Sequence, residues 1–236
     1  MMFARGCLIA FLLVFGPHDG LARGKDPRVP PGTDPGGVAV ALISAGIDYT
    51  LPQIAGRLAR DGEGDVIGWD FVDGDALPFA PADGEGPSGA TALASAILAE
   101  APAVRLVPVR VDIGQAGSVS KALAFVAKTP ARAVLLTALA PNGDWGLFRL
   151  AAREFKQLLI VVPADPAAAD LDNVLLIESP DNAAAESADT VPSLELASAA
   201  NAIRIAAEAA AGDPSLDGAG LKHAVLERQA GQEKRQ

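Results

Sequence analysis

His and Cys, two residue types that commonly act as bases, nucleophiles or metal ligands, are scarce in this chain, which contains only two His, His18 and His223, and one Cys, Cys7. A Ser nucleophile needs a base, usually a His, to accept its proton, and a further group to orient that base. A single Cys excludes a disulfide framework and any Cys-rich zinc or iron–sulfur site. The glycine-rich phosphate-binding motifs GxGxxG and GxxxxGK[ST] are also missing from the sequence. We therefore expect no cofactor and no bound metal.

The first 22 residues have the layout of a secretory signal peptide. Arg5 precedes an unbroken apolar run, CLIAFLLVF at 7–15, and a Gly-Pro break and small residues at 20–22 follow. The run is too short to span a bilayer, which needs about 20 apolar residues. A buried N-terminal helix is the alternative. Cleavage near Ala22 would remove the Cys and the first His, so we expect an exported protein, periplasmic or secreted, with His223 as its one His.

The acidic composition restricts the partners of the protein. The chain has 236 residues, 19 Lys and Arg against 29 Asp and Glu, and a formal net charge of −10. Nucleic-acid binders and polybasic membrane-surface modules need the opposite charge, so we expect neither a nucleic-acid partner nor membrane binding after signal cleavage. Half of the residues are hydrophobic, enough for a packed core. We expect a flexible, Pro- and Gly-rich lead-in at 23–36, one domain at 37–230 and a frayed tail at 231–236.

Short apolar runs alternate with helical patterns along the domain. Strands are predicted at 37–43, 66–72, 104–111, 133–139, 159–162 and 173–178. Within the third strand, Pro108 indicates an edge position or an irregularity. Helices are predicted at 89–100, 119–128, 147–158, 194–211 and 216–229. This alternation predicts βαβ units, and hence a three-layer α/β/α fold with a mostly parallel central sheet.

Several segments resemble, in order, the signatures of the subtilisin-like serine peptidases (peptidase S8, subtilases). ISAGIDYTLPQI at 43–54 resembles the family pattern I-D-[ST]-G-[IV]-D-x-x-H-P-x-L. GWDFVDGD at 68–75 resembles GWDFVxxD, and APAVRLVPVRV at 101–111 resembles APxAxLxPVRV. Weaker likenesses occur at 83–95, 160–165, 196–201 and 213–226, so the resemblance covers roughly residues 37–230. It implies a subtilisin-like fold; the alternative is chance agreement through a generic parallel α/β fold.

The resemblance also implies where catalytic residues should stand, and the chain keeps none of them. The family's catalytic Asp matches Ser44, and its catalytic His matches Gly89, or Ser88 with a shift of one residue. The oxyanion-hole Asn matches Asp165, and the nucleophilic Ser matches Ala197, with Ser198 beside it. An ionised Asp165 would repel a developing oxyanion. We therefore predict no Ser–His–Asp catalysis, and we expect His223 to be a surface residue of the last helix.

Other catalytic sets have little support in the sequence. A sedolisin-like set would need acids on the helix at 89–99, which has none before Glu100, and a Ser–Lys dyad would need a Lys beside Ser198. The loop acids Asp48, Asp83 and Asp165 could converge for acid–base work or for Ca²⁺ binding. The spacing of a calcium loop is missing, however, and solvated loop acids are the favoured interpretation in so acidic a chain.

The sequence thus favours a catalytically inactive pseudopeptidase that binds a peptide or a protein. In active family members the substrate lies as an added β-strand against an edge strand near the cleft, and the matching segment is 134–139. The predicted peptide-binding residues are Leu136, Thr137, Ala138 and Leu139. Two alternatives stay open. One is an active serine endopeptidase or other hydrolase with a non-standard catalytic set. The other is an unrelated α/β protein that binds a small ligand at the carboxyl ends of its strands.

Overall fold

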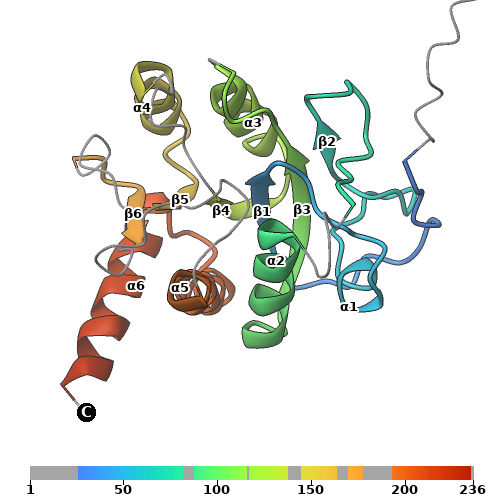
Figure 1. Ribbon diagram of the computed structural model, residues 1–236. Coiled ribbons are helices and arrows are strands. Elements are labelled where there is room, and N and C mark those ends of the chain that lie inside the picture. Colours follow the sequence, from blue (N-terminus) through green and yellow to red (C-terminus); the bar gives the residue numbers. More distant parts are fainter. Residues whose placement is uncertain are drawn as a thin grey trace, which may run out of the picture.

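A six-stranded parallel sheet forms the centre of the protein (Figure 1). The structure, a computed structural model, describes residues 26–81, 88–115, 117–137, 145–163, 170–177 and 193–234. The strands are β1 (Val38–Ser44), β2 (Trp69–Asp70), β3 (Val104–Arg110), β4 (Ala131–Leu136), β5 (Leu159–Pro163) and β6 (Val174–Ile177). Their order in the sheet is β2-β3-β1-β4-β5-β6, and every neighbouring pair is parallel. The expected signal peptide lies outside the described residues.

Helices cover both faces of the sheet, as the sequence predicts. They are α1 (Pro52–Ala55), α2 (Gly89–Glu100), α3 (Ser118–Val126), α4 (Trp145–Glu154), α5 (Ser193–Gly212) and α6 (Gly218–Glu233). The core on one face contains residues of α1, α2, α5 and α6, and the core on the other face contains residues of α3 and α4. Figure 1 shows α2 and α5 on one side of the sheet and α3 and α4 on the other. The three-layer α/β/α prediction is therefore confirmed.

The central strands are apolar on both faces because both faces are covered. From Ala39 to Ser44, every residue of β1 is at most 1% exposed. Small residues allow α5 to pack closely: Ala200, Ala202 and Ala206 on this helix are each at most 1% exposed. Among the described residues, no helix is both long and apolar enough to cross a bilayer.

Three predicted features differ in the structure. The strand predicted at 66–72 is only two residues long, because the Asp70 carboxylate accepts hydrogen bonds from the backbone of Val72 (2.7 Å) and Asp73 (3.0 Å) and turns the chain away from β3. Pro108 lies inside β3, opposite Leu42. The N–H of Leu106 points away from β1, and the backbone nitrogen two residues later in a strand points the same way. The nitrogen of Pro108, which has no hydrogen to donate, therefore faces the side of β3 where the short β2 has not yet begun.

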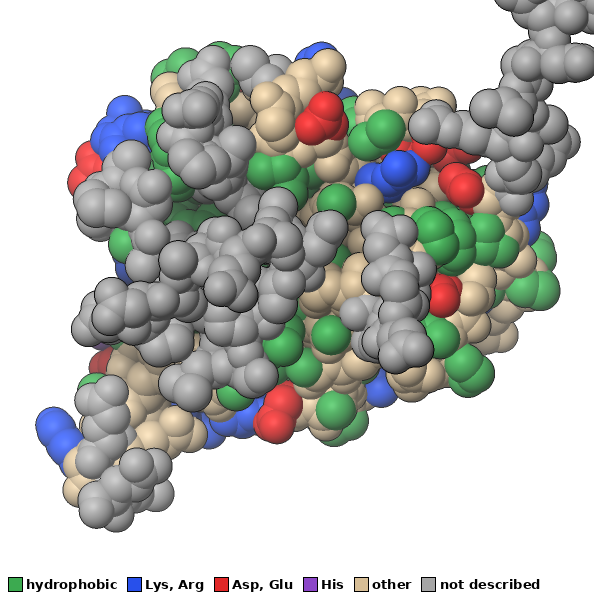
Figure 2. All heavy atoms as spheres, in the orientation of Figure 1, with side chains coloured by type: hydrophobic (Ala, Val, Ile, Leu, Met, Phe, Trp, Pro, Cys, Tyr) green, Lys and Arg blue, Asp and Glu red, His purple; other side chains and the backbone are tan. Residues whose placement is uncertain are grey.

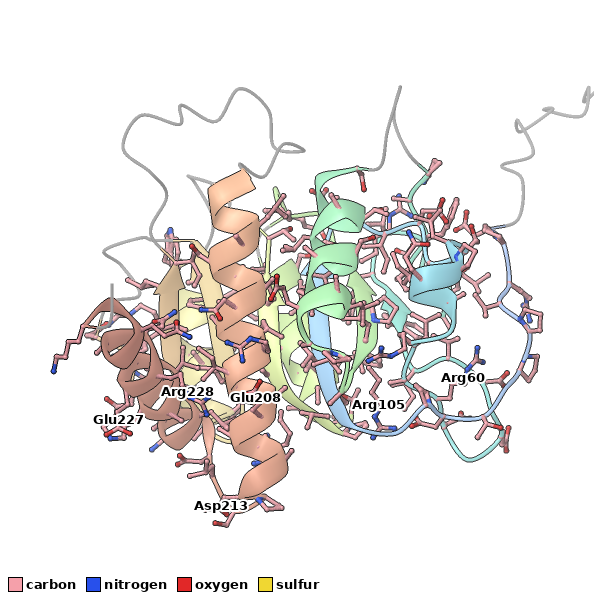
Figure 3. All side chains as sticks on the ribbon, turned by 90° about the horizontal axis from the view of Figure 1, so that it is seen from below. Arg60, Arg105, Glu208, Asp213, Glu227 and Arg228 are labelled. Atoms are coloured by element: carbon pink, nitrogen blue, oxygen red, sulfur yellow. The ribbon has the colours of Figure 1, made fainter. Side chains whose placement is uncertain are left out.

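The third difference concerns residues 26–36, here called the N-terminal arm, which lie in the segment expected to be flexible. The carboxylate of Asp34 accepts hydrogen bonds from the backbone N–H groups of Arg60 (2.8 Å) and Gly36 (2.7 Å), and it pairs with the guanidinium of Arg105. Arg60 in turn donates to the carbonyl of Pro30 at 3.1 Å. Arg60 and Arg105, labelled in Figure 3, lie on the side of the molecule along which the arm runs. These contacts hold the arm against the domain.

Candidate functional site

Ser44, which matches the catalytic Asp of the resembled family, is the last residue of β1. Its side chain is buried (1% exposed), and its hydroxyl oxygen accepts a hydrogen bond from the backbone N–H of Gly46 at 3.1 Å. Gly46 has a φ of +112°, and a Cβ there would lie 2.7 Å from the Cβ of Ala80, so the turn requires glycine. The Ser44 hydroxyl therefore closes a tight turn, and it carries no charge that could orient a protonated imidazole.

Ser88, the shifted match to the catalytic His, caps the N-terminus of α2. Its hydroxyl accepts a hydrogen bond from the backbone N–H of Thr91 at 3.3 Å and lies 2.9 Å from the Thr91 hydroxyl. The backbone N–H of Asp48 donates to the same Thr91 hydroxyl at 3.0 Å. Thr91 thus joins the loop after β1 to the start of α2. Gly89 is the first residue of this helix and offers no functional side chain.

The chain topology brings the start of α5 to the same edge of the sheet. The end of α5 is close to the amino edge, because Arg132 at the start of β4 donates to the carbonyl of Pro214 at 2.9 Å. The N-terminal end of α5 therefore lies towards the carboxyl edge, beside the N-terminal end of α2, against which α5 packs (Figure 3). Ala197 is exposed and Ser198 half-buried in this part of the helix. Ser44, Ser88 and Ser198 thus lie towards one edge of the sheet, whereas Asp165 is outside the described residues.

The predicted peptide-binding segment lies only partly within the described residues. β4 is an interior strand between β1 and β5, so its body has no free edge for an added strand. Leu136 is 1% exposed, which leaves its side chain out of reach of a ligand. Thr137 follows the end of β4 and donates its N–H to the carbonyl of Ile43 at 3.1 Å. Ala138 and Leu139 lie outside the described residues, so a peptide could approach only beyond the end of the strand.

The candidate bases and acids that the structure describes lie elsewhere or are already hydrogen-bonded. His223 is on α6, its side chain is 73% exposed, and its Nε2 lies 3.2 Å from the carboxylate of Glu227 on the same helix. α6 packs on α5, β5 and β6, so the expectation of a surface His in the last helix is met. Lys121 lies on α3, on the face opposite α2 and α5. The Asp48 carboxylate accepts hydrogen bonds from the backbone and hydroxyl of Thr50, and Asp83 is outside the described residues.

A buried ion pair connects three of the segments that carry the sequence resemblance. Asp70, from the GWDF segment, is fully buried and lies 2.8 Å from the guanidinium of Arg110, from the PVRV segment. The same nitrogen lies 2.7 Å from the carboxylate of Asp73. The Nε of Arg110 donates to the carbonyl of Ala45, in the turn after β1, at 3.1 Å. Burial acts to lower the pKa of Arg110, but the bonds and charges of the two acids outweigh it and raise that pKa.

The sequence-based predictions did not include this ion pair, although a signal was present: the apolar strand pattern at 66–72 contains one acid, Asp70, and the pattern at 104–111 contains two Arg, Arg105 and Arg110. Asp26 of the N-terminal arm joins the group, with a carboxylate oxygen within 4.8 Å of those of Asp70 and Asp73. Burial, and next the charge of Asp73, raise the pKa of Asp26 above its usual value. Carboxylate oxygens are ligands for divalent cations. Here the guanidinium of Arg110 already bridges two of the three acids, and we assign no metal to the cluster.

Comparison with known proteins identifies the fold and nothing finer. No protein-family model matches the sequence, and no curated protein matches it significantly. A solved cold-adapted subtilisin-like serine proteinase superposes with a TM-score of 0.56 at 15% identity, covering 82% of this chain and 82% of that one. A lanthipeptide protease superposes with a TM-score of 0.53 at 16% identity, covering 79% of each chain. The chain therefore has the fold of subtilisin-like proteases, across most of its length.

Proposed function

We propose that the protein is an exported, catalytically inactive relative of subtilisin-like peptidases that acts by binding a peptide or a protein partner. One observation carries this proposal. Ser44 matches the catalytic Asp, and Gly89, or Ser88 with a shift of one residue, matches the catalytic His. The hydroxyls of Ser44 and Ser88 are used in local hydrogen bonds, and Gly89 has no side chain. None of these residues can orient a base or act as one near neutral pH. The His that the structure describes, His223, is mostly exposed on α6. Among the described residues, a Ser at the carboxyl edge would therefore have no His to accept its proton.

An active hydrolase with a non-standard catalytic set is the second candidate, and one observation favours it. Ser198 follows the position that matches the nucleophile, lies near the start of α5, and is only half-buried. A third possibility, a small-ligand-binding protein unrelated to peptidases, loses support because the fold is shared with subtilisin-like proteases across most of the chain.

Hydrolysis of unfolded casein and of a mixed fluorogenic peptide library, measured over a range of pH, distinguishes the first two candidates. The proposal expects no turnover from purified protein whose far-UV circular dichroism shows it to be folded. It also expects no covalent labelling by a fluorophosphonate, a reagent that modifies activated Ser hydroxyls. Turnover or labelling that Ser198→Ala or Ser88→Ala abolishes would establish a rebuilt active site. Ser120→Ala, on α3 at the opposite face, is the matched control.

Binding is then measured with an array of extended peptides under the same conditions. The proposal expects that the protein retains some peptides and returns them intact, as shown by mass spectrometry. Retention of none, by folded protein, would leave peptide binding without support and direct attention to a folded protein partner.

A further inference from the structure

The N-terminal arm and the domain enclose a pocket with a volume of about 420 Å³ between them. The arm contributes Arg28, Val29 and Pro30, and the domain contributes residues around Tyr49, Val66 and Leu77. This volume is within the range of pockets that bind small molecules, about 300–1,000 Å³. Figure 2 shows hydrophobic side chains, with acidic side chains among them, on the side of the molecule that carries α1 and β2.

The pocket is preformed because its arm wall is fixed at several points. The hydroxyl of Tyr49 donates to the carbonyl of Pro27 at 2.8 Å, and the backbone N–H of Gly32 donates to the carbonyl of Gly64 at 3.0 Å. The Asp34 contacts described above hold the end of the arm. A preformed wall reduces the entropy cost of ordering the protein when a ligand binds.

Two oppositely charged side chains that line the pocket have no partner in the described part of the chain. Arg28 and Asp65 are both exposed residues that line it. Neither side chain forms an ion pair or a hydrogen bond with another described residue, and they do not pair with each other. Apolar side chains, among them Val66 and Leu77, line the same pocket. A ligand complementary to this arrangement has an apolar body, one carboxylate and one ammonium group.

The acidic residues that line the pocket add an orientation. Both of them, Asp65 and Asp75, belong to the domain, so the potential on the domain side is negative and favours an ammonium group there. Arg28, on the arm side, is complementary to a carboxylate.

We propose that this pocket binds an apolar dipeptide, with its terminal carboxylate at Arg28 and its ammonium group at Asp65. The free termini of a dipeptide are about 6–7 Å apart when extended, whereas those of a free amino acid are on one carbon, so the dipeptide suits two charges that do not touch each other. The inference goes beyond the proposed function and does not depend on it, since the pocket contains none of Ser44, Ser88 and Ser198, and an active peptidase could carry it equally well.

Isothermal titration calorimetry of the full chain with Leu-Leu tests the inference. We expect saturable one-to-one binding that is weaker for leucine, and weaker again for isovalerate and isoamylamine, which each carry only one of the two charges. Arg28→Gln and Asp65→Asn should each raise the Kd for Leu-Leu about two- to fivefold, the range of an exposed ion pair. Glu63→Gln, an exposed acid in the same loop that does not line the pocket, should leave the Kd unchanged.

Three outcomes would overturn the inference: no saturable heat with Leu-Leu, equal binding of isoamylamine and Leu-Leu, or unchanged Kd values in both pocket variants. Thermal unfolding of each variant shows whether it is folded, and both substitutions are at exposed positions. Inactivity in the casein assay has no bearing on this result, and dipeptide binding has none on the catalytic question, so the two proposals fail separately.

Discussion

Removal of the Arg110 guanidinium should destabilise the fold strongly, because it would leave the Asp70 carboxylate buried without its cation. Asp70 is fully buried, and Asp73 and Asp26 add two like charges nearby. Breaking a buried ion pair by removing one partner costs about 3–5 kcal/mol. The Arg110 side chain is 22% exposed, so we expect the lower end, about 3 kcal/mol, for Arg110→Met.

Urea unfolding followed by Trp fluorescence measures this effect. With a slope of about 2–3 kcal/mol per molar, the midpoint should fall by about 1–1.5 M urea. Arg228→Met, at a residue labelled in Figure 3, is the matched control: its guanidinium lies 3.4 Å from Glu208, both side chains are about half exposed, and about 0–1 kcal/mol is expected. In the Asp70→Asn background, Arg110→Met should cost clearly less, since the two residues are coupled. A loss equal to that of the control would refute the assignment of Arg110 as the link between the three segments.

Three further outcomes follow from the structure. Asp34→Asn should loosen the N-terminal arm, seen as faster amide hydrogen exchange in 26–36. Burial acts to raise the pKa of Asp34, but its hydrogen bonds and Arg105 lower that pKa overall. The arm contacts should therefore be intact above the ordinary Asp pKa and be lost as pH falls through the lowered value. The same acid response in Asp34→Asn would contradict this. Ser88→Ala should lower the unfolding free energy by about 1 kcal/mol through loss of the α2 cap, with Ser120→Ala near zero. Gly46→Ala should cost about 1–3 kcal/mol, and a neutral result would show that the turn after β1 can relax.

The fold shared with proteases leaves the catalytic question to individual side chains. A fold is a scaffold on which many sites can be built, so likeness at 15–16% identity does not assign an activity. The replaced residues have local structural roles: Ser44 closes a turn, and Ser88 caps a helix. A short hydroxyl side chain suits both roles, which gives a physical reason for Ser at positions 44 and 88 that does not depend on whether the protein is active.

Much of the layered architecture could be predicted from the sequence. Continuous apolar runs such as that of β1 predict strands covered on both faces, and the Ala-rich pattern of α5 predicts a closely packed helix. Ser88 before the small-residue run at 89–100 stands where the α2 cap lies. These features are local, because each depends on residues that are neighbours in the chain.

The tertiary structure decided what depends on residues far apart in the chain. Asp70 and Arg110 are 40 positions apart, and Asp34 and Arg105 are farther apart still, so no periodic pattern relates them. The interior position of β4 follows from the strand order, which short apolar runs do not encode. The docking of the arm and its pocket likewise depend on contacts between 26–36 and the loops around Tyr49 and Val66. Local patterns determine which elements form, and the pairing of distant polar groups decides how those elements and the arm meet.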